Sequence, residues 1–192
     1  MQDLGAKLLT PEESLAMEVR GGRTDSAVLV PLFTDASGRL HAVFTRRRDD
    51  LKRHAGEISF PGGRRDPGEG LIDTALREAH EEVGLPPDHV DIIGALAPVG
   101  TFVTNYAIYP FVGLIEPGFE WTLQETEVAE VLEFSLEDLI KGHSLKRLVR
   151  RGMTFKTDVY EVDGHMVWGA TARILGDLLF RTGDGPPLRP LP

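Results

Sequence analysis

The amino-acid sequence predicts an α/β fold in which a β-sheet is sandwiched between helices. Short aliphatic runs typical of strands alternate with helix-start signals along the chain. They occur on both sides of a Glu-rich segment, 71–83, whose apolar residues recur at helical spacing. With 192 residues and no internal repeat or linker, we expect a single domain spanning 1–192. Strands and helices in this order favour layers packed around a common core.

Four helices are expected from start and stop signals. Thr10 suits an N-cap, Pro11 the first helical position and Glu13 a capping box. Ser135 opens a similar capping pattern, and Gly84 suits the position that ends the Glu-rich helix. The expected helices lie at about 10–19, 71–83, from 135–138 onward, and 170–180.

Strands are expected where short runs of aliphatic, β-branched or aromatic residues occur. These runs lie at 26–33, 40–45, 58–60, 91–98, 108–115 and 128–134, with a further hairpin within 153–167. The turn at 35–38 should join the first two strands, and Asp163-Gly164 should be the turn of the last hairpin. We expect an irregular basic loop at 46–57 and a loose Pro-rich tail from about Gly183.

Composition excludes several classes of function. The chain has no cysteine, which excludes disulfides, thiolate zinc sites and cysteine nucleophiles. No apolar run approaches the roughly 18 residues of a membrane span, and the N-terminus lacks a signal-peptide layout. We therefore expect a cytoplasmic protein with no membrane partner. A net charge of −9 argues against nucleic acid as a partner. No segment demonstrates a subunit interface, and a homodimer is the assembly we expect from its general frequency.

Basic residues are concentrated in one part of this acidic chain. Seven of the 21 Lys and Arg residues are Arg46, Arg47, Arg48, Lys52, Arg53, Arg64 and Arg65. A basic cluster beside an acidic helix suits an anionic substrate that a cation bridges to the carboxylates. The alternative is a solvated surface loop.

The segment 63–85 combines a glycine-rich loop with an acidic helix. At about 100° per residue, Glu78, Glu81 and Glu82 fall within one arc of about 100°. The apolar residues of the helix occupy a neighbouring arc that can face the core, at Ile72, Ala75, Leu76, Ala79 and Val83. Carboxylates this close repel one another, and a divalent ion removes that penalty. Hard oxygen ligands select Mg²⁺ or Mn²⁺ over zinc. The alternative is a solvated acidic face without a metal. In that case the spacing of Gly63, Glu69, Arg77 and Gly84 would be a coincidence.

This spacing resembles the Nudix box, G-xxxxx-E-xxxxxxx-RE-U-x-EE-x-G-U, where U is a bulky aliphatic residue. The polar and glycine positions are all filled, at Gly63, Glu69, Arg77, Glu78, Glu81, Glu82 and Gly84. Ala79 departs from the pattern, because it is small where Val, Ile or Leu is usual. The resemblance implies a Nudix-type α/β/α sandwich with a mixed central sheet, and metal-dependent hydrolysis of a pyrophosphate.

The resemblance also implies roles for individual residues. Glu78, Glu81 and Glu82 would be the principal metal ligands, and Glu69 an auxiliary ligand or support. We expect Arg77 to pair with a motif carboxylate and orient it. The Gly62-Gly63 backbone would let a carbonyl approach the metal, since no side chain obstructs it.

The catalytic set is completed by a general base, which need not lie in the box. Besides Glu78 and Glu82, we expect Glu127 to be catalytic as this base, with Glu125 as runner-up, because family members commonly carry another acid before the strand at 128–134. Such a base contributes about 10²–10⁴-fold. The alternative is that both are solvated loop acids.

The segment 45–63 resembles the signature of the coenzyme A pyrophosphatase branch, LLT-x-RS-xxx-R-xxx-G-xxx-FPGG. Thr45, Arg47, Gly56 and the Phe60-Pro61-Gly62-Gly63 block align without gaps, while Val43-Phe44, Arg48 and Lys52 depart from it. Lys52 keeps the charge of the usual Arg but loses its bidentate geometry. Downstream, Tyr160 and the segment 167–172 look like the same branch.

This second resemblance implies the substrate. Hydrolysis of coenzyme A would give adenosine 3′,5′-bisphosphate and 4′-phosphopantetheine, and acyl or oxidised forms would be accepted because the thiol end is far from the cut bond. Arg47, Lys52 and Gly56 would bind substrate, with Arg46 or Arg53 as further cationic contacts. We expect His54 to be incidental and Trp168 to belong to the core.

Other functions stay open at this point. Another Nudix enzyme would act on ADP-ribose, a dinucleotide such as NADH, or an oxidised nucleotide. A non-catalytic nucleotide-sensing Nudix module would bind without turnover, and a structural protein with an acidic helix would show no metal response. Cleavage assays on a substrate panel separate these alternatives.

Overall fold

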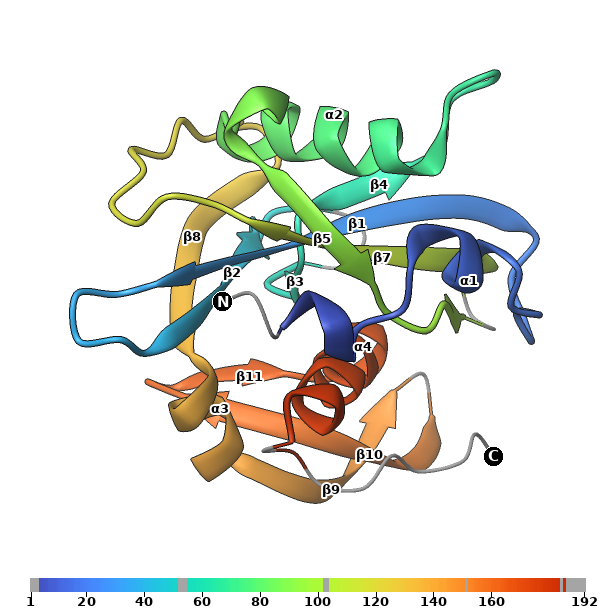
Figure 1. The fold of residues 1–192 in the computed structure, drawn as a ribbon. Helices are drawn as coiled ribbons and strands as arrows, with labels where there is room; N and C mark the ends of the chain where they lie inside the picture. Colours follow the sequence, from blue (N-terminus) through green and yellow to red (C-terminus); the bar gives the residue numbers. More distant parts are fainter. Residues whose placement is uncertain (1–3, 52–54, 102–103, 151, 184, 186–192) are drawn as a thin grey trace.

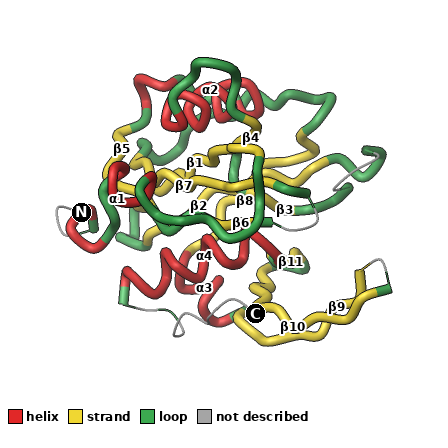
Figure 2. The backbone as a smooth tube through the Cα atoms, turned by 90° about the vertical axis from the view of Figure 1, so that its right-hand side faces the viewer, coloured by secondary structure: helices red, strands yellow, loops and turns green. Residues whose placement is uncertain are grey.

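A computed structural model describes the protein at residues 4–51, 55–101, 104–150, 152–183 and 185 (Figure 1). Its centre is an eight-stranded mixed sheet with helices against both faces. Helix α2 (Leu71–Val83) covers one face, and helix α4 (Gly169–Thr182) covers the other together with a second, three-stranded sheet. Figure 2 shows these layers from the side, with α2 above the central sheet and α4 below it. The predicted α/β sandwich with a mixed central sheet is confirmed.

The first eight strands along the chain form the central sheet, and the last three form the second sheet. The central sheet contains β1 (Thr24–Thr34), β2 (Leu40–Arg47), β3 (Ile58–Ser59), β4 (Gly62–Arg64), β5 (Asp91–Ala95), β6 (Val99–Gly100), β7 (Tyr106–Leu114) and β8 (Val128–Ser135). The second sheet contains β9 (His143–Arg150), β10 (Met153–Val162) and β11 (His165–Val167). The remaining helices are α1 (Pro11–Leu15), α3 (Leu136–Lys141) and the 3₁₀ turns η1 (Gly5–Lys7) and η2 (Pro87–His89).

The long strand β1 organises the central sheet. It pairs in parallel with β7 and antiparallel with β2, so the expected hairpin through 35–38 is present. Near its start β1 also pairs with β4, where Ala27 lies opposite Gly63. Strand β2 pairs with β8 from His41 to Arg47, and near its end it also pairs with β3. These pairings bring the segments around Arg47, Gly63 and 124–128 to the same end of the sheet.

Two apolar cores separate the layers. On one face of the sheet, Ala75, Ala79 and Val83 of α2 pack with Leu29 and Phe111, all fully buried. On the other face, residues of α4 and the second sheet form the larger core, with Tyr160, Phe44, Phe60 and Leu175. The apolar stripe predicted for α2 therefore faces the sheet. The Glu residues of the predicted acidic arc lie beside the end of the sheet that carries Gly62.

Helix α2 begins and ends where the sequence predicts. Gly84 adopts a left-handed conformation with φ of 72°, and its N–H donates to the last carbonyls of the helix. A side chain at this position would be strained, so the glycine fixes the helix end. Ala79, the departure from the family pattern, is fully buried against the sheet.

The first helix is shorter than predicted. The capping box of Thr10 and Glu13 is present, but α1 ends at Leu15 instead of about Val19. Leu15 and Met17 are exposed, so a further turn would gain no buried face. A short helix without tertiary packing is unstable, which accounts for the early end.

Several strands differ from the prediction. Arg46 and Arg47 belong to β2 and not to the expected basic loop, because β3 and β8 supply backbone partners for this end of the strand. The short strands β4 and β6 were not predicted, nor was β9, whose Lys and Arg residues hide its pattern. The hairpin of β10 and β11 turns at Asp163-Gly164 as predicted. In the described part of the chain, no helix is long and apolar enough to cross a membrane.

Candidate active site

Arg77 lies at the centre of the acidic cluster on α2. Its Nε donates to Glu69 Oε1 at 2.8 Å, and its Nη1 donates to Glu78 Oε1 at 2.9 Å and to Glu81 Oε2 at 3.1 Å. Its Nη2 also donates to the backbone carbonyl of Arg64 at 3.2 Å. A single guanidinium thereby holds three motif carboxylates and ties them to the β4 segment.

Glu69 is held by the densest set of donors in the motif. Besides Arg77, the Thr74 hydroxyl donates to its Oε2 at 2.7 Å and the Asp66 N–H at 3.2 Å. These hydrogen bonds, with Arg77 as the largest cause, lower the pKa of Glu69 to about 2. Thr74 is fully buried on α2. Sequence reasoning missed Thr74, although a polar residue on the apolar side of the helix was a visible signal.

Glu82 is the buried carboxylate of the cluster. Only 8% of the residue is exposed, and the backbone N–H of Gly62 donates to its Oε2 at 3.2 Å. Burial is the main reason that the pKa of Glu82 is raised to about 8; the Gly62 hydrogen bond and Arg47 oppose this shift, and the charges of Glu78 and Glu127 add to it. The contact that the structure gives for the Gly62 backbone is this N–H donated to the Glu82 carboxylate. The expected approach of a glycine carbonyl to a metal stays a prediction.

Glu78 fits beside Gly63 because that position has no side chain. A Cβ atom at residue 63 would collide with the Glu78 carboxylate. Burial raises the pKa of Glu78, the Arg77 contact lowers it, and the charges of Glu81 and Glu127 raise it. The glycine-rich loop thus leaves the space in which a motif carboxylate lies.

Residues from two other segments reach the same site. Arg47 Nη1 of β2 lies 3.4 Å from Glu127 Oε2, and both charges act on Glu82. The loop that carries Glu127 is fixed to the end of α2, because the Gln124 N–H donates to the Glu82 carbonyl at 2.9 Å. The Nε atom of Arg47 is buried and has no hydrogen-bond partner among the described residues. Arg47 and Glu127 therefore face the motif carboxylates.

Two other arginines of the predicted basic cluster are paired with carboxylates outside the motif. Arg46 pairs with Asp49 at 3.1 Å and with Glu130 at 3.3 Å, and Arg65 pairs with Asp25. These arginines are neutralised by surface carboxylates, as the solvated-loop alternative implies. Lys52, Arg53 and His54 lie outside the described residues. Gly56 has φ of 68° and packs against Asp49, so in the structure its role is that of a turn.

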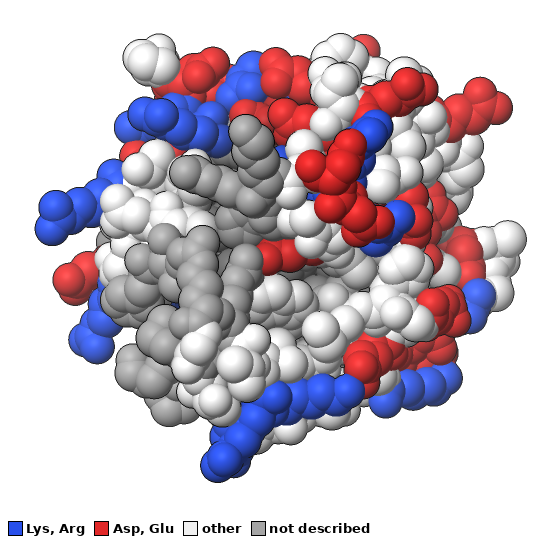
Figure 3. Space-filling model, turned by 180° about the vertical axis from the view of Figure 1, so that it is seen from behind, with Lys and Arg blue, Asp and Glu red and all other residues white. Residues whose placement is uncertain are grey.

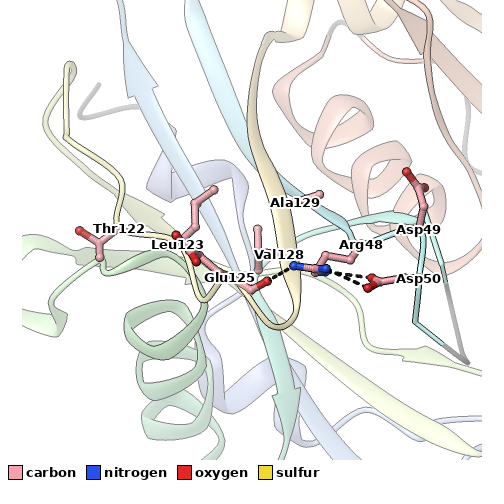
Figure 4. A pocket seen from close by; sticks show the side chains of 8 residues that line it. All are labelled: Arg48, Asp49, Asp50, Thr122, Leu123, Glu125, Val128 and Ala129. Atoms are coloured by element: carbon pink, nitrogen blue, oxygen red, sulfur yellow. Dashed lines mark hydrogen bonds and ion pairs between the residues drawn. The ribbon is translucent and has the colours of Figure 1, made fainter.

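Arg48 and Glu125 line a separate hollow on this side of the molecule (Figure 4). Arg48 donates to the Glu125 carbonyl at 2.7 Å and pairs with Asp50 at 2.8 Å. The hollow measures about 790 Å³ and includes no motif carboxylate in its lining. Its single guanidinium is already paired, so this hollow does not suit a polyanionic ligand.

The charges of the site gather on one face of the molecule. In Figure 3 acidic and basic residues crowd the upper part of the view, where α2 lies, and acidic atoms also lie inside the hollow below them, beside uncharged surface. An anionic substrate in this hollow would meet carboxylates unless a cation intervened.

The carboxylate oxygens of the motif are the kind of ligand that a hard divalent ion prefers. Glu78, Glu81 and Glu82 supply carboxylate oxygens on one helix, and buried Glu82 lacks a guanidinium of its own within the hydrogen bonds described. Within the described residues, no three His, Cys, Asp or Glu side chains are placed as a metal-holding group. Glu81 instead pairs with Arg77, and its side chain is 56% exposed. A cation near Glu82 would offset the cost of its buried charge.

Comparison with known proteins adds independent information. Residues 23–153 match the family model of the NUDIX domain. The protein called Uncharacterized Nudix hydrolase NudL from Citrobacter koseri is 38% identical over 168 residues, which cover 85% of each chain. Its namesake from Enterobacter sp. is 39% identical with the same coverage.

Solved structures show the same fold. The MutT/nudix family protein from Enterococcus faecalis has a TM-score of 0.55 at 14% identity, over 88% of this chain and 65% of that one. The Nudix hydrolase RenU from M. Smegmatis has a TM-score of 0.53 at 20% identity, over 65% of this chain and 76% of that one. At these identities the likeness concerns the fold.

Proposed function

The chain belongs to the Nudix hydrolase family, and we propose that its pyrophosphatase site acts on coenzyme A, giving adenosine 3′,5′-bisphosphate and 4′-phosphopantetheine. One observation carries this proposal. The segment 45–63, which resembles the coenzyme A signature, meets the motif helix at the carboxylates through Arg47 and Gly62. Acyl and oxidised forms of coenzyme A are included, since their thiol end lies far from the bond that breaks.

The carboxylates of α2 are proposed to hold the metal. Nudix enzymes typically use a divalent ion, and Mg²⁺ or Mn²⁺ held by Glu78, Glu81 and Glu82 would neutralise the pyrophosphate oxygens. Glu69 and Arg77 support this set, because Arg77 links Glu69 to Glu78 and Glu81. Gly63 leaves the space for Glu78.

Water is the nucleophile in the proposed reaction. Its oxygen forms a bond to one phosphorus of the pyrophosphate while the bridging P–O bond breaks, and the bridging oxygen leaves with the other phosphate. Glu127 accepts the proton of this water, since its side chain is 51% exposed and lies beside Arg47 at the site edge. Arg47 binds a phosphate oxygen through a charge-assisted hydrogen bond.

A substrate panel tests the proposal. The purified protein is incubated with Mg²⁺ and equal concentrations of coenzyme A, ADP-ribose, NADH and a dinucleoside polyphosphate, and products are resolved by chromatography. We expect adenosine 3′,5′-bisphosphate to form fastest. Faster cleavage of ADP-ribose or NADH would overturn the coenzyme A assignment. Ligand binding without turnover of any compound would instead favour a sensing module.

Arginine variants link the substrate to the upstream motif. Arg47→Ala should raise KM for coenzyme A about 10–100-fold, since a hydrogen bond to a charged group contributes about 1.5–3 kcal/mol. Arg65→Ala is the matched control, because Arg65 belongs to the same basic cluster but pairs with Asp25 at the surface. Equal effects of the two substitutions would remove Arg47 from the substrate site.

A further inference from the structure

A second cavity lies on the opposite side of the sheet edge from α2. It measures about 550 Å³, a size typical of small-molecule sites. The segment 55–58 forms one wall, and the second sheet forms the other. The apolar lining includes Ile58, Leu148, Phe155, Met166 and Trp168, and the Phe155 and Trp168 rings lie 6.4 Å apart. Trp168, expected in the core, is partly exposed here.

The charges around this cavity disfavour an anionic ligand. Arg46 is the cation in its lining, and both Asp49 and Glu130 already pair with that guanidinium. Glu57 adds a carboxylate to the wall, and Glu130 also lies 3.5 Å from His165. The phosphates of a nucleotide would meet no unmatched positive charge among these described residues. An uncharged, largely apolar group suits the cavity better.

The cavity adjoins the candidate active site through β2 and β3. Arg46 and Arg47 are consecutive in β2, but Arg46 lines the cavity, whereas Arg47 lies 3.4 Å from Glu127 at the candidate active site. The Arg47 N–H donates to the Glu57 carbonyl at 3.0 Å, and Glu57 lies in the cavity wall. Strand β3 comprises two residues. The cavity and the candidate active site thus lie on opposite sides of the same edge of the sheet.

We propose that this cavity binds the acyl chain of a coenzyme A thioester, and that Leu148, Phe155 and Trp168 set the preference for chain length. The inference rests on the proposed function, because the chain is attached to the arm of that substrate. The polar arm would pass the segment 55–57, and the chain would lie against the second sheet.

Turnover of a thioester series tests the subsite. KM is measured with Mg²⁺ for coenzyme A and its acetyl, butanoyl and octanoyl thioesters. We expect KM for octanoyl-CoA to be at least about tenfold below that for acetyl-CoA, because tenfold corresponds to burial of about two of the six additional methylenes. Leu148→Asn should abolish this ratio. Leu145→Asn is the matched control on the same strand, because Leu145 is exposed and does not line the cavity, and it should keep the ratio.

Binding without turnover gives a second readout. The chain has two tryptophans, so Trp121→Phe leaves Trp168 as the reporter. S-octanoyl-4′-phosphopantetheine, which carries no pyrophosphate, should change Trp168 emission at a lower concentration than 4′-phosphopantetheine. An unchanged emission with both compounds would place the chain elsewhere and overturn the inference.

The outcomes separate the two proposals. Cleavage of coenzyme A with no dependence on chain length, or equal effects of Leu148→Asn and Leu145→Asn, would overturn the acyl subsite alone. No cleavage of any coenzyme A compound, with rapid cleavage of another pyrophosphate, would overturn both the substrate assignment and the subsite.

Discussion

Glu69 and Glu82 belong to the same motif but lie in opposite electrostatic environments. Glu69 accepts hydrogen bonds from Arg77, Thr74 and a backbone N–H, and its pKa is lowered to about 2. Glu82 is buried, accepts from the Gly62 N–H, and has its pKa raised to about 8. The carboxylate that begins the motif is thus stabilised as an anion, whereas the one near its end is destabilised as an anion.

This difference shows that the protein itself satisfies one charge and leaves the other unmatched. Glu69 fixes Arg77, which in turn positions Glu78 and Glu81. Glu82 is where an added cation would gain most, because burial and neighbouring carboxylates raise the free energy of its charged form. In the proposed mechanism, these surroundings favour a support role for Glu69 and a ligand role for Glu82.

The largest expected effect separates these two roles. Glu82→Gln should lower kcat about 10³-fold, as removal of a direct stabiliser of transition-state charge does. Glu69→Gln should cost about 10–100-fold, since supporting residues of metal sites have effects of this size. Both are measured as Mg²⁺-dependent turnover of coenzyme A. Equal losses would end the distinction between ligand and support.

The proposed base gives the next largest effect. Glu127→Gln should lower kcat about 10²-fold by removing the proton acceptor. Glu125→Gln is the control, because the structure engages the Glu125 carbonyl with Arg48 and places its side chain at the other hollow. We expect a change below about twofold for Glu125→Gln. Near-normal turnover of Glu127→Gln would remove that residue from the mechanism.

The sequence alone predicts the helix of the site but not the environment of each carboxylate. Spacing and Gly84 are local signals, and α2 has the predicted bounds. Glu81 and Glu82 share the predicted acidic arc, yet one is exposed and the other is buried. Burial of Glu82 arises from the loop at 122–127 and from Gly62, which are distant in sequence. Helical periodicity carries no information on such contacts.

The basic segment and the second sheet were also harder to predict, because their structure depends on contacts with residues distant in sequence. Arg46 and Arg47 are neighbours of equal charge, but they pair with different carboxylates. Strand β9 has a basic sequence and is formed by its register with β10, which a local pattern does not reveal. The hairpin of β10 and β11 was predicted, but the third strand of this sheet and the cavity beside it were not.

Stability measurements compare the two carboxylates without catalysis. In metal-free protein, Glu82→Gln should raise the free energy of unfolding by about 2–3 kcal/mol at pH 7, because folding no longer transfers a carboxylate with a raised pKa from water. The folded pKa is about 8 and the ordinary value is 4.5, so wild-type stability falls as pH rises between them. The gain from Glu82→Gln should grow over this window. Urea unfolding at pH 5, 7 and 8.5 measures it, and a pH-independent gain would contradict the burial argument.

Glu69 should show the opposite pH dependence with a smaller size. Its folded pKa of about 2 lies below the ordinary 4.5, so its contribution is present above pH 4.5 and is lost as pH falls through about 2. Glu69→Gln should destabilise by about 1–2 kcal/mol at pH 7, since Arg77 is partly exposed and its ion pairs are screened by water. The deficit should shrink steadily below pH 4.5, as followed by urea unfolding between pH 7 and pH 3. If the signed changes in the free energy of unfolding caused by Glu69→Gln and by Glu82→Gln had pH slopes of the same sign, the two carboxylates would not differ as their contacts indicate. Opposite slopes from one motif would show that the fold, and not the residue type, assigns each carboxylate its role.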